Sequence, residues 1–566
     1  MKEFERRPGG RELPVKVGFE KVVDDDVGDR VIDANRAGQA TLDVRANRAL
    51  VDPAHDTHRI QCHCTERIIT RHVPRRVHIH HRMPDHARRV LFALNEPGYL
   101  RFYGPAIVEL ERRGWNVSLV YGKPEKRGPD LEVPVDAGER VRSLGTLPGG
   151  VSPVAKNLRI AIDCARYLEP AFVKAEYLRR RAERELSPGF GFIKHIRRAP
   201  RVVVTAAIGV ERLLERMLPV NATTRDFLTQ LQPDLVVVSP LVIIGGSGVQ
   251  ETEVLKAARA LAIPTVVAVA SWDHLTSKGL IRLVPDAVVV WNDIQAREAE
   301  QLHRIPRNRI MVTGAQSFDR WFDRTRPDAV DAFRRSLGID ANRRVLLLVG
   351  SSRNMAPGDS EVQFARRWIA ALRTADAAQV RDAFVIIRPH PGNTSPWQQA
   401  DLGDSHAVVH PTSYASGVLM SDGDLETFRY SLLASSAVVG INTSAMIEAA
   451  VVRRPVFSVR DPAFAHSQQQ TLHFGYLSEA AGGFTVVADD LPEHVRLLEK
   501  LFAEGEPDLR QSDAFVARFV RPLGMTTDAN THLCDALERV AAARGASREP
   551  ADAMAVDTPD AISPGR

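Results

Sequence analysis

The chain has 566 residues, of which 44% are hydrophobic and 26% charged, and its formal net charge is only +5. This length exceeds what one hydrophobic core serves, so we expect two domains with extensions, and the small charge argues against a nucleic-acid partner. No apolar run approaches the ~20 residues of a membrane span, no secretory signal is visible, and four cysteines suit a reducing cytoplasm.

Residues 1–85 differ from the rest of the chain. They show no sustained period of 2 or 3.6 residues, and they hold seven of the eighteen histidines. Cys62 and Cys64 lack the paired spacing of zinc modules, so we expect no metal site there. Met83 precedes a short basic stretch and the apolar run 90–94, as is typical of a native start. We therefore interpret residues 1–85 as a low-order extension, either disordered or upstream of the natural start.

Residues 86–325 are predicted to form a first Rossmann-like domain. Its opening, with a strand at 90–94, a helix at 105–113 and a strand at 115–121, is a βαβ unit. Continuous Val and Ile runs between helices indicate a parallel sheet buried on both faces. The further strands are expected at 233–240, 263–269, 286–291 and 309–314, and a further helix at 250–261.

A helical, basic insertion is expected at about 154–216, within the first domain. Its cationic residues between 179 and 201 are Arg179, Arg180, Arg181, Arg184, Lys194, Arg197, Arg198 and Arg201. One interpretation is a solvated helix face, the usual place of a charge run. The other is a peripheral contact with anionic lipid head groups at the inner face of the membrane, or with a lipid-linked phosphate acceptor.

Residues 326–545 are predicted to form a second Rossmann-like domain, followed by a tail at 546–566 with little to bury. The chain is thus predicted to be α/β, with two doubly wound domains facing across a cleft. The expected strands are 344–350, 383–387, 407–410, 437–440, 456–459 and 484–487. The expected helices are 445–452 and those within 512–542.

The most informative stretch lies after the strand at 437–440. Asn442, Thr443 and Ser444 stand where a helix begins, and residues of this type leave backbone N–H groups available for a phosphate. Glu448 lies about one turn further on, where a carboxylate can reach ribose hydroxyls. The alternative for the hydroxyl residues alone is an ordinary helix cap.

This strand–GxNTSxxxEA–helix–RPVxSV pattern resembles the nucleotide-sugar half of GT-B glycosyltransferases. The similarity extends over residues 90–541 and points to CDP-glycerol glycerophosphotransferases, capsule-polysaccharide transferases and the UDP-GlcNAc 2-epimerase fold. It implies transfer of a sugar or polyol-phosphate from a nucleotide-activated donor on the second domain to a surface-polysaccharide or lipid-linked acceptor on the first. Two alternatives stay open: a 2-epimerase-like isomerase, whose SGG-xx-EE phrase is absent here, and a non-catalytic scaffold in polysaccharide assembly.

Two further segments are candidates for donor binding because they follow strands of the second domain. Ser351, Ser352 and Arg353 come after the strand at 344–350, where a guanidinium could pair with a diphosphate. Arg388 and His390 end the next strand and resemble the R-x-HP phrase of the same enzymes, which implies a phosphate or donor role.

The general base is expected in the first domain. Asp273 and His274 follow the strand at 263–269, and either could accept a proton from an acceptor hydroxyl. Glu96, in the loop after the first strand, competes for this role, since GT-B enzymes often keep a base there. The resemblance implies no essential metal and no cofactor, because such enzymes stabilise the leaving diphosphate with a helix dipole and cations.

Overall fold

The computed structural model describes residues 87–123, 132–240, 250–323, 327–414, 421–505 and 507–545. The expectations for residues 1–85, including the start at Met83, and for the tail at 546–566 lie outside these residues. Among the described helices, none is long and apolar enough to cross a membrane.

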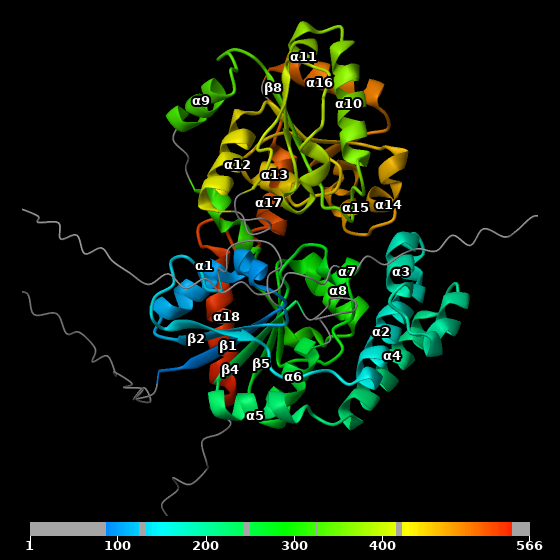
Figure 1. Ribbon diagram of the computed structural model, residues 1–566, viewed down its shortest axis with the longest axis vertical. Coiled ribbons are helices and arrows are strands. Elements are labelled where there is room, and N and C mark those ends of the chain that lie inside the picture. Colours follow the sequence, from blue (N-terminus) through cyan, green and yellow to red (C-terminus); the bar gives the residue numbers. More distant parts are fainter. Residues whose placement is uncertain are drawn as a thin grey trace, which may run out of the picture. The chain divides into compact units, whose positions relative to one another are not determined.

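The first sheet comprises seven described strands, all parallel, in the order β3-β2-β1-β4-β5-β6-β7 (Figure 1). The strands are β1 (Arg89–Leu94), β2 (Asn116–Tyr121), β3 (Val141–Thr146), β4 (Leu235–Ser239), β5 (Thr265–Ala268), β6 (Ala287–Val290) and β7 (Ile310–Val312). Every strand expected in this domain is present. The edge strand β3 was not predicted, because its half-exposed residues and the glycine at 145, with φ of +73°, give it no apolar run.

Helices cover both faces of this sheet, as its buried Val and Ile runs require. One face packs on α1 (Leu100–Arg112) and α18 (Ala529–Gly545). The other packs on α5 (Ala222–Leu231), α6 (Gln250–Ala260) and α8 (Asp293–His303). We expected residues through 545 to belong to the second domain, but α18 packs on the first. Leu533 and Leu537 are fully buried against the first sheet, so this helix completes the first domain's core.

The second sheet has six described parallel strands, in the order β10-β9-β8-β11-β12-β13, and all six were expected. They are β8 (Val345–Val349), β9 (Phe384–Arg388), β10 (Ala407–Val409), β11 (Ala437–Gly440), β12 (Val456–Val459) and β13 (Thr485–Ala488). One face packs on α10 (Ser360–Arg373) and α16 (Leu491–Glu504), and the other on α12 (Asp422–Ala434), α13 (Ala445–Val451) and α17 (Arg510–Phe519). The remaining helices here are α9 (Pro327–Ser336), α11 (Ala378–Arg381), α14 (Ala465–Gln468) and α15 (Phe474–Leu477).

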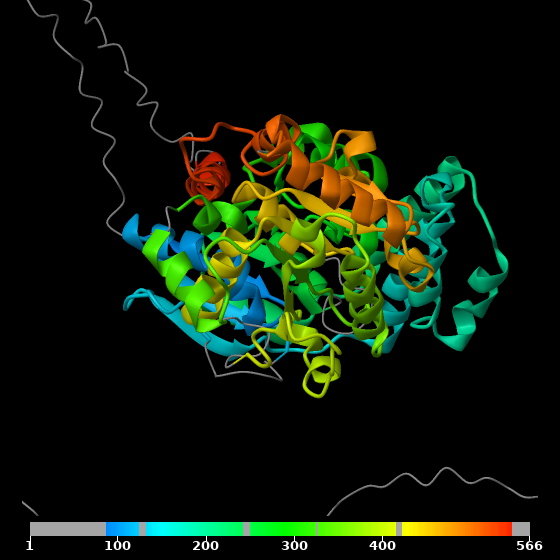
Figure 2. The same ribbon diagram turned by 90° about the horizontal axis from the view of Figure 1, so that it is seen from above.

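The segment 154–216 is helical, as expected, and consists of α2 (Pro153–Ala165), α3 (Glu176–Glu183), a 3-10 segment (Pro188–His195) and α4 (Arg201–Met217). These helices gather at one side of the first sheet in both views (Figures 1 and 2). They have a core of their own around Leu178 and Ile208. A buried ion cluster fastens them to the first domain: Arg159 donates to Glu215 over 2.9 Å and to Glu253 over 2.6 Å.

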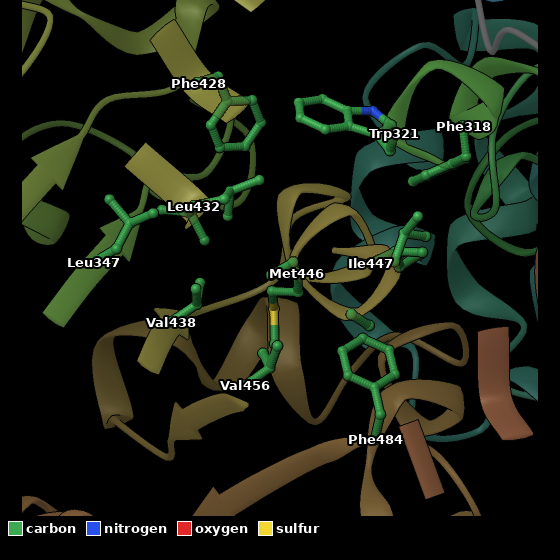
Figure 3. Packing of buried hydrophobic residues seen from close by; sticks show 14 of the residues in the cluster. Phe318, Trp321, Leu347, Phe428, Leu432, Val438, Met446, Ile447, Val456 and Phe484 are labelled. Carbon is green, nitrogen blue, oxygen red and sulfur yellow. The ribbon is translucent and has the colours of Figure 1, made fainter. Parts of the chain in front are cut away.

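One hydrophobic cluster joins residues of both domains. Trp321, after β7, packs edge-to-face on Phe428 of α12 with ring centroids 5.1 Å apart (Figure 3). Phe318 and Trp272 from the first domain belong to the same cluster as Ile447 of α13. Aromatic burial of this kind holds the loops of the two sheets against each other.

Candidate functional site

A cavity of about 380 Å³ lies where the carboxyl ends of the two sheets meet. Its walls come mainly from the segments that follow β1, β5, β6, β7, β8, β9 and β11, with further residues from the segments after β3, β10 and β12. Side chains at this edge are presented by loops rather than packed between strands, which is why open α/β sheets bind ligands there. Among the described residues, five cationic side chains contribute to the lining: Arg101, Arg181, Lys278, Arg320 and Arg388.

The start of α13 forms one wall of the cavity. Asn442, Thr443, Ser444 and Glu448 all line the cavity. The Asn442 amide donates to the carbonyl of Ser467 over 2.6 Å, which fixes its orientation. Its Oδ1 atom is buried and has no hydrogen-bond partner among the described residues. Such an acceptor is costly to leave unpaired, so it is suited to a donor group on a ligand.

Glu448 is the acidic group of this wall. Burial raises its pKa to about 7, and the guanidinium groups of Arg320, Arg388 and Arg101 oppose that shift only in part. Arg388 donates to the carbonyl of Asp424 over 2.9 Å, and its guanidinium lies 4.5 Å from the ring centre of Phe428. Glu448 therefore sits among positive groups yet holds its proton more firmly than an ordinary glutamate.

His390 lines the cavity directly after β9. Burial lowers its pKa to about 4, and the nearby Arg101 adds to this effect. Its Nδ1 atom accepts the backbone N–H of Gly392 over 3.0 Å. The neutral ring must then carry its proton on Nε2, which makes His390 a neutral hydrogen-bond donor rather than a cation.

The segment after β5 forms the opposite wall and includes both Asp273 and His274. The carboxylate of Asp273 accepts the hydroxyls of Ser271 over 2.7 Å and Ser277 over 2.6 Å. Burial would raise the pKa of Asp273, but the Lys278 ammonium, 3.9 Å away, and the neighbouring histidines outweigh it and lower the pKa well below its usual range. Asp273 is thus held ionised.

His274 and His473 are neutral as well. Burial lowers the pKa of each to about 4. The Nδ1 atom of His274 is buried with no partner among the described residues. His473, from the polar segment after β12, lies 3.3 Å from the hydroxyl of Thr276 and 3.4 Å from the Asn442 amide. It therefore links the two walls of the cavity.

The structure brings most of the candidate residues together, but three lie apart. Ser352 lines the cavity, whereas Ser351 is fully buried with its backbone N–H donating to Glu361 over 2.8 Å. Arg353 is exposed and does not contribute to the lining. Glu96 is also absent from the lining, and its carboxylate pairs with Lys123 at 2.9 Å.

Several lining cations were not among the candidates. Arg101 opens α1, Arg181 lies on α3 of the insertion, and Arg320 lies in the 3-10 segment Gln316–Phe322. None belongs to a motif, so no local signal marked them. Arg181 was visible only as one member of a charge run.

The two doubly wound parallel domains, with this cavity at their carboxyl edges, form a GT-B-type fold. No family model matches the chain, and no curated protein matches it. Solved structures align with about 80% of it at low identity. With TM-scores below 0.5, these similarities carry no conclusion about function.

Three of these structures illustrate the kinds of protein that align with the chain. A glycosyltransferase from Rickettsia africae is 9% identical, with 80% of this chain and 99% of that chain covered and a TM-score of 0.43. UDP-GlcNAc 2-epimerase from Neisseria meningitidis, bound to UDP-GlcNAc, is 13% identical, with coverages of 80% and 100% and a TM-score of 0.43. The wall teichoic acid polymerase TagF is 10% identical, with coverages of 81% and 89% and a TM-score of 0.39.

Proposed function

We propose that this protein is a nucleotide-dependent glycosyltransferase or a glycerophosphotransferase-like enzyme acting in polysaccharide assembly. The observation that carries the proposal is the cavity itself. It combines cationic side chains from both domains with a carboxyl group and an unpaired amide oxygen from the second. Cations suit a diphosphate, and the two acceptors suit the hydroxyl and N–H groups of a nucleoside.

In this proposal the donor lies against α13 and the end of β9. Glu448 and Asn442 accept hydrogen bonds from the nucleoside, while Arg320 and Arg388 face the diphosphate. His390 donates through Nε2 to the departing phosphate oxygen. Preorganised donors of this kind lower a barrier most when charge develops on the leaving group, and they do so without an essential metal.

The base belongs, in this proposal, to the segment after β5. Asp273 and His274 both line the cavity, and Glu96 does not. Asp273 is ionised and fixed by two hydroxyls, so it is suited to accept a hydrogen bond from an acceptor hydroxyl and orient it. Its lowered pKa makes it a weak proton acceptor, so His274 is the stronger candidate for the base. Measuring transfer and donor affinity in Asp273→Asn and in His274→Gln identifies the base. The variant that lacks the true base should lose transfer while keeping its affinity for the donor.

The acceptor is proposed to carry negative charge. A second cavity on the insertion is lined by Arg180, Arg181, Arg184 and Lys194 together with Tyr177 and Glu183. Arg181 lines both cavities, so an anionic acceptor held on the insertion could present its reacting end to the donor. A lipid-linked phosphate or an acidic glycan has this chemistry.

The first experiment is calorimetric titration of the full chain with UDP, GDP, CDP and TDP and with their sugar or glycerol conjugates, in EDTA. We expect one nucleotide to bind, and Arg320→Ala to weaken it by about tenfold or more, the scale of one charged hydrogen bond. Arg353→Ala is the matched control, because that arginine lies outside the cavity. If no nucleotide binds, the scaffold alternative replaces the enzyme.

The second experiment follows the bound donor by mass spectrometry with and without candidate acceptors. Transfer predicts a new conjugate and a free nucleotide, and that transfer should persist in EDTA. An isomerised donor with no conjugate would favour the epimerase alternative.

A further inference from the structure

The outer face of α4 is a feature that the donor cavity does not use. Large apolar side chains of this helix are exposed to solvent, which is unusual when they are contiguous. Val202 is 73% exposed, Val210 57%, Leu213 56% and Met217 72%. Val203 and Leu214 are exposed beside them. Ala206 and Gly209, also exposed, complete the face without adding a polar group.

Placing these residues on a helix of 100° per residue gives three separate stripes. The exposed apolar residues cover an arc of about 140°. Val204, Ile208, Glu211 and Glu215 share the buried stripe that packs into the insertion. Arg201 and Arg216 are exposed along one border of the apolar arc, whereas the guanidinium of Arg212 turns toward the protein and donates to the carbonyls of Ile281, Arg282 and His303. The helix is therefore apolar outward and basic at its margin.

Both acidic residues of α4 point inward. Glu215 is fully buried in the ion cluster with Arg159, and it also lies 2.9 Å from the Lys256 ammonium. Glu211 is 2% exposed, and burial raises its pKa to about 7. Because the ion cluster fixes which side of α4 faces the protein, it also fixes the apolar side outward.

The segment leading into α4 has the same character. From residue 186 to residue 217 the acidic residues are Glu211 and Glu215, and both are buried. The exposed residues include Phe192, Ile196, Lys194, Arg197 and Arg198. Apolar side chains bordered by cations, with no exposed carboxylate, match the head groups and acyl chains of an anionic bilayer.

We propose that α4 is a membrane-surface helix that lies flat on an anionic phospholipid bilayer, with its apolar face among the upper acyl chains. At 1.5 Å per residue, its 17 residues span about 25 Å along the surface. The proposal differs from a contact through the basic residues 179–201, because insertion of apolar side chains carries the affinity and the cations orient it. It does not depend on the identity of the donor.

The test is cosedimentation of the full chain with phosphatidylcholine vesicles and with vesicles containing phosphatidylglycerol. Binding is expected for the anionic vesicles and should weaken in high salt. Leu213→Asp should reduce partitioning by about tenfold or more, and Val210→Asp combined with it should reduce it further. Val135→Asp is the matched control, since Val135 is 72% exposed but lies outside the insertion. Its partitioning should stay within about twofold of wild type.

Two results would overturn the proposal. One is wild-type protein that does not bind anionic vesicles, or that binds them equally well with Leu213→Asp. The other is that the wild-type protein is a dimer in the absence of lipid and that Leu213→Asp makes it a monomer. In that case a second copy of the chain would cover the apolar face of α4. Circular dichroism establishes that each variant is folded. Nucleotide titration of the same variants should be unchanged, which keeps this test separate from that of the donor cavity.

Discussion

Replacement of Glu448 by glutamine should make the unliganded protein more stable while weakening nucleotide binding. Burial raises the pKa of this carboxyl to about 7, whereas the unfolded chain ionises near 4.5. The folded state therefore resists ionisation, and its stability falls as pH rises from about 4.5 to about 7. Above pH 7 the loss is complete. Glutamine keeps the shape of the protonated acid and carries no charge to bury.

The size of the effect follows from the same shift. One pKa unit corresponds to about 1.4 kcal/mol, so a change from 4.5 to about 7 corresponds to about 3 kcal/mol. Water entering the cavity screens part of this electrostatic cost, so the expected gain in the free energy of unfolding is about 1–3 kcal/mol. In a domain of this size such a gain should raise Tm by roughly 2–10 °C at pH 8 and by little at pH 5.

The assay is thermal and urea denaturation of wild type and Glu448→Gln at pH 5 and pH 8, without nucleotide. Glu426→Gln, at an exposed position of α12, serves as the control. Nucleotide affinity at pH 8 should fall by about tenfold as a charged acceptor is lost. A variant no more stable than wild type at pH 8 would refute the electrostatic reasoning. A more stable variant with unchanged affinity would remove Glu448 from the binding site.

Three further outcomes are expected. Gly350→Ala should destabilise the second domain by about 1–3 kcal/mol and weaken nucleotide binding, since its Cβ would lie 2.6 Å from the backbone nitrogen of His390; an unchanged Tm would contradict this. Arg159→Met should cost about 3–5 kcal/mol in urea unfolding, because Glu215 would lose its buried partner; a smaller loss would show that Lys256 suffices. Glu96→Gln should bind nucleotide as wild type does, and a weaker titration would place Glu96 at the site.

Much of the architecture was predictable from sequence because buried parallel strands are nearly continuous apolar runs. The stretches 90–94, 344–350 and 437–440 carry that signal whatever surrounds them. The edge strand β3 lacks it, because one side of an edge strand faces solvent and half of its residues need not be apolar. The packing of α18 on the first domain was also hidden, since an amphipathic pattern does not say which core receives the helix.

The candidate site was also predictable from the sequence only in part. The helix start after β11 and the histidine after β9 were predictable, because the carboxyl end of a strand fixes the edge at which the next residues emerge. The direction of each side chain within those loops was not. Ser351 is buried, with its backbone N–H bound to Glu361, and Arg353 is exposed to solvent. The cations that do reach the cavity, such as Arg320, come from segments without a motif.

The sequence by itself thus determined twelve of the thirteen described strands, the start of α13 and the edge at which a ligand could bind, because each depends on residues near one another in the chain. It placed the start of α1 at residue 105, whereas this helix begins at Leu100. Only the tertiary structure decided which cations share a cavity and which face of α4 is outward. Glu211 and Glu215 count as surface charges in the sequence, and packing against Arg159 buries Glu215 and leaves an apolar face exposed. Such outcomes depend on partners more than forty residues away, and no local pattern encodes them.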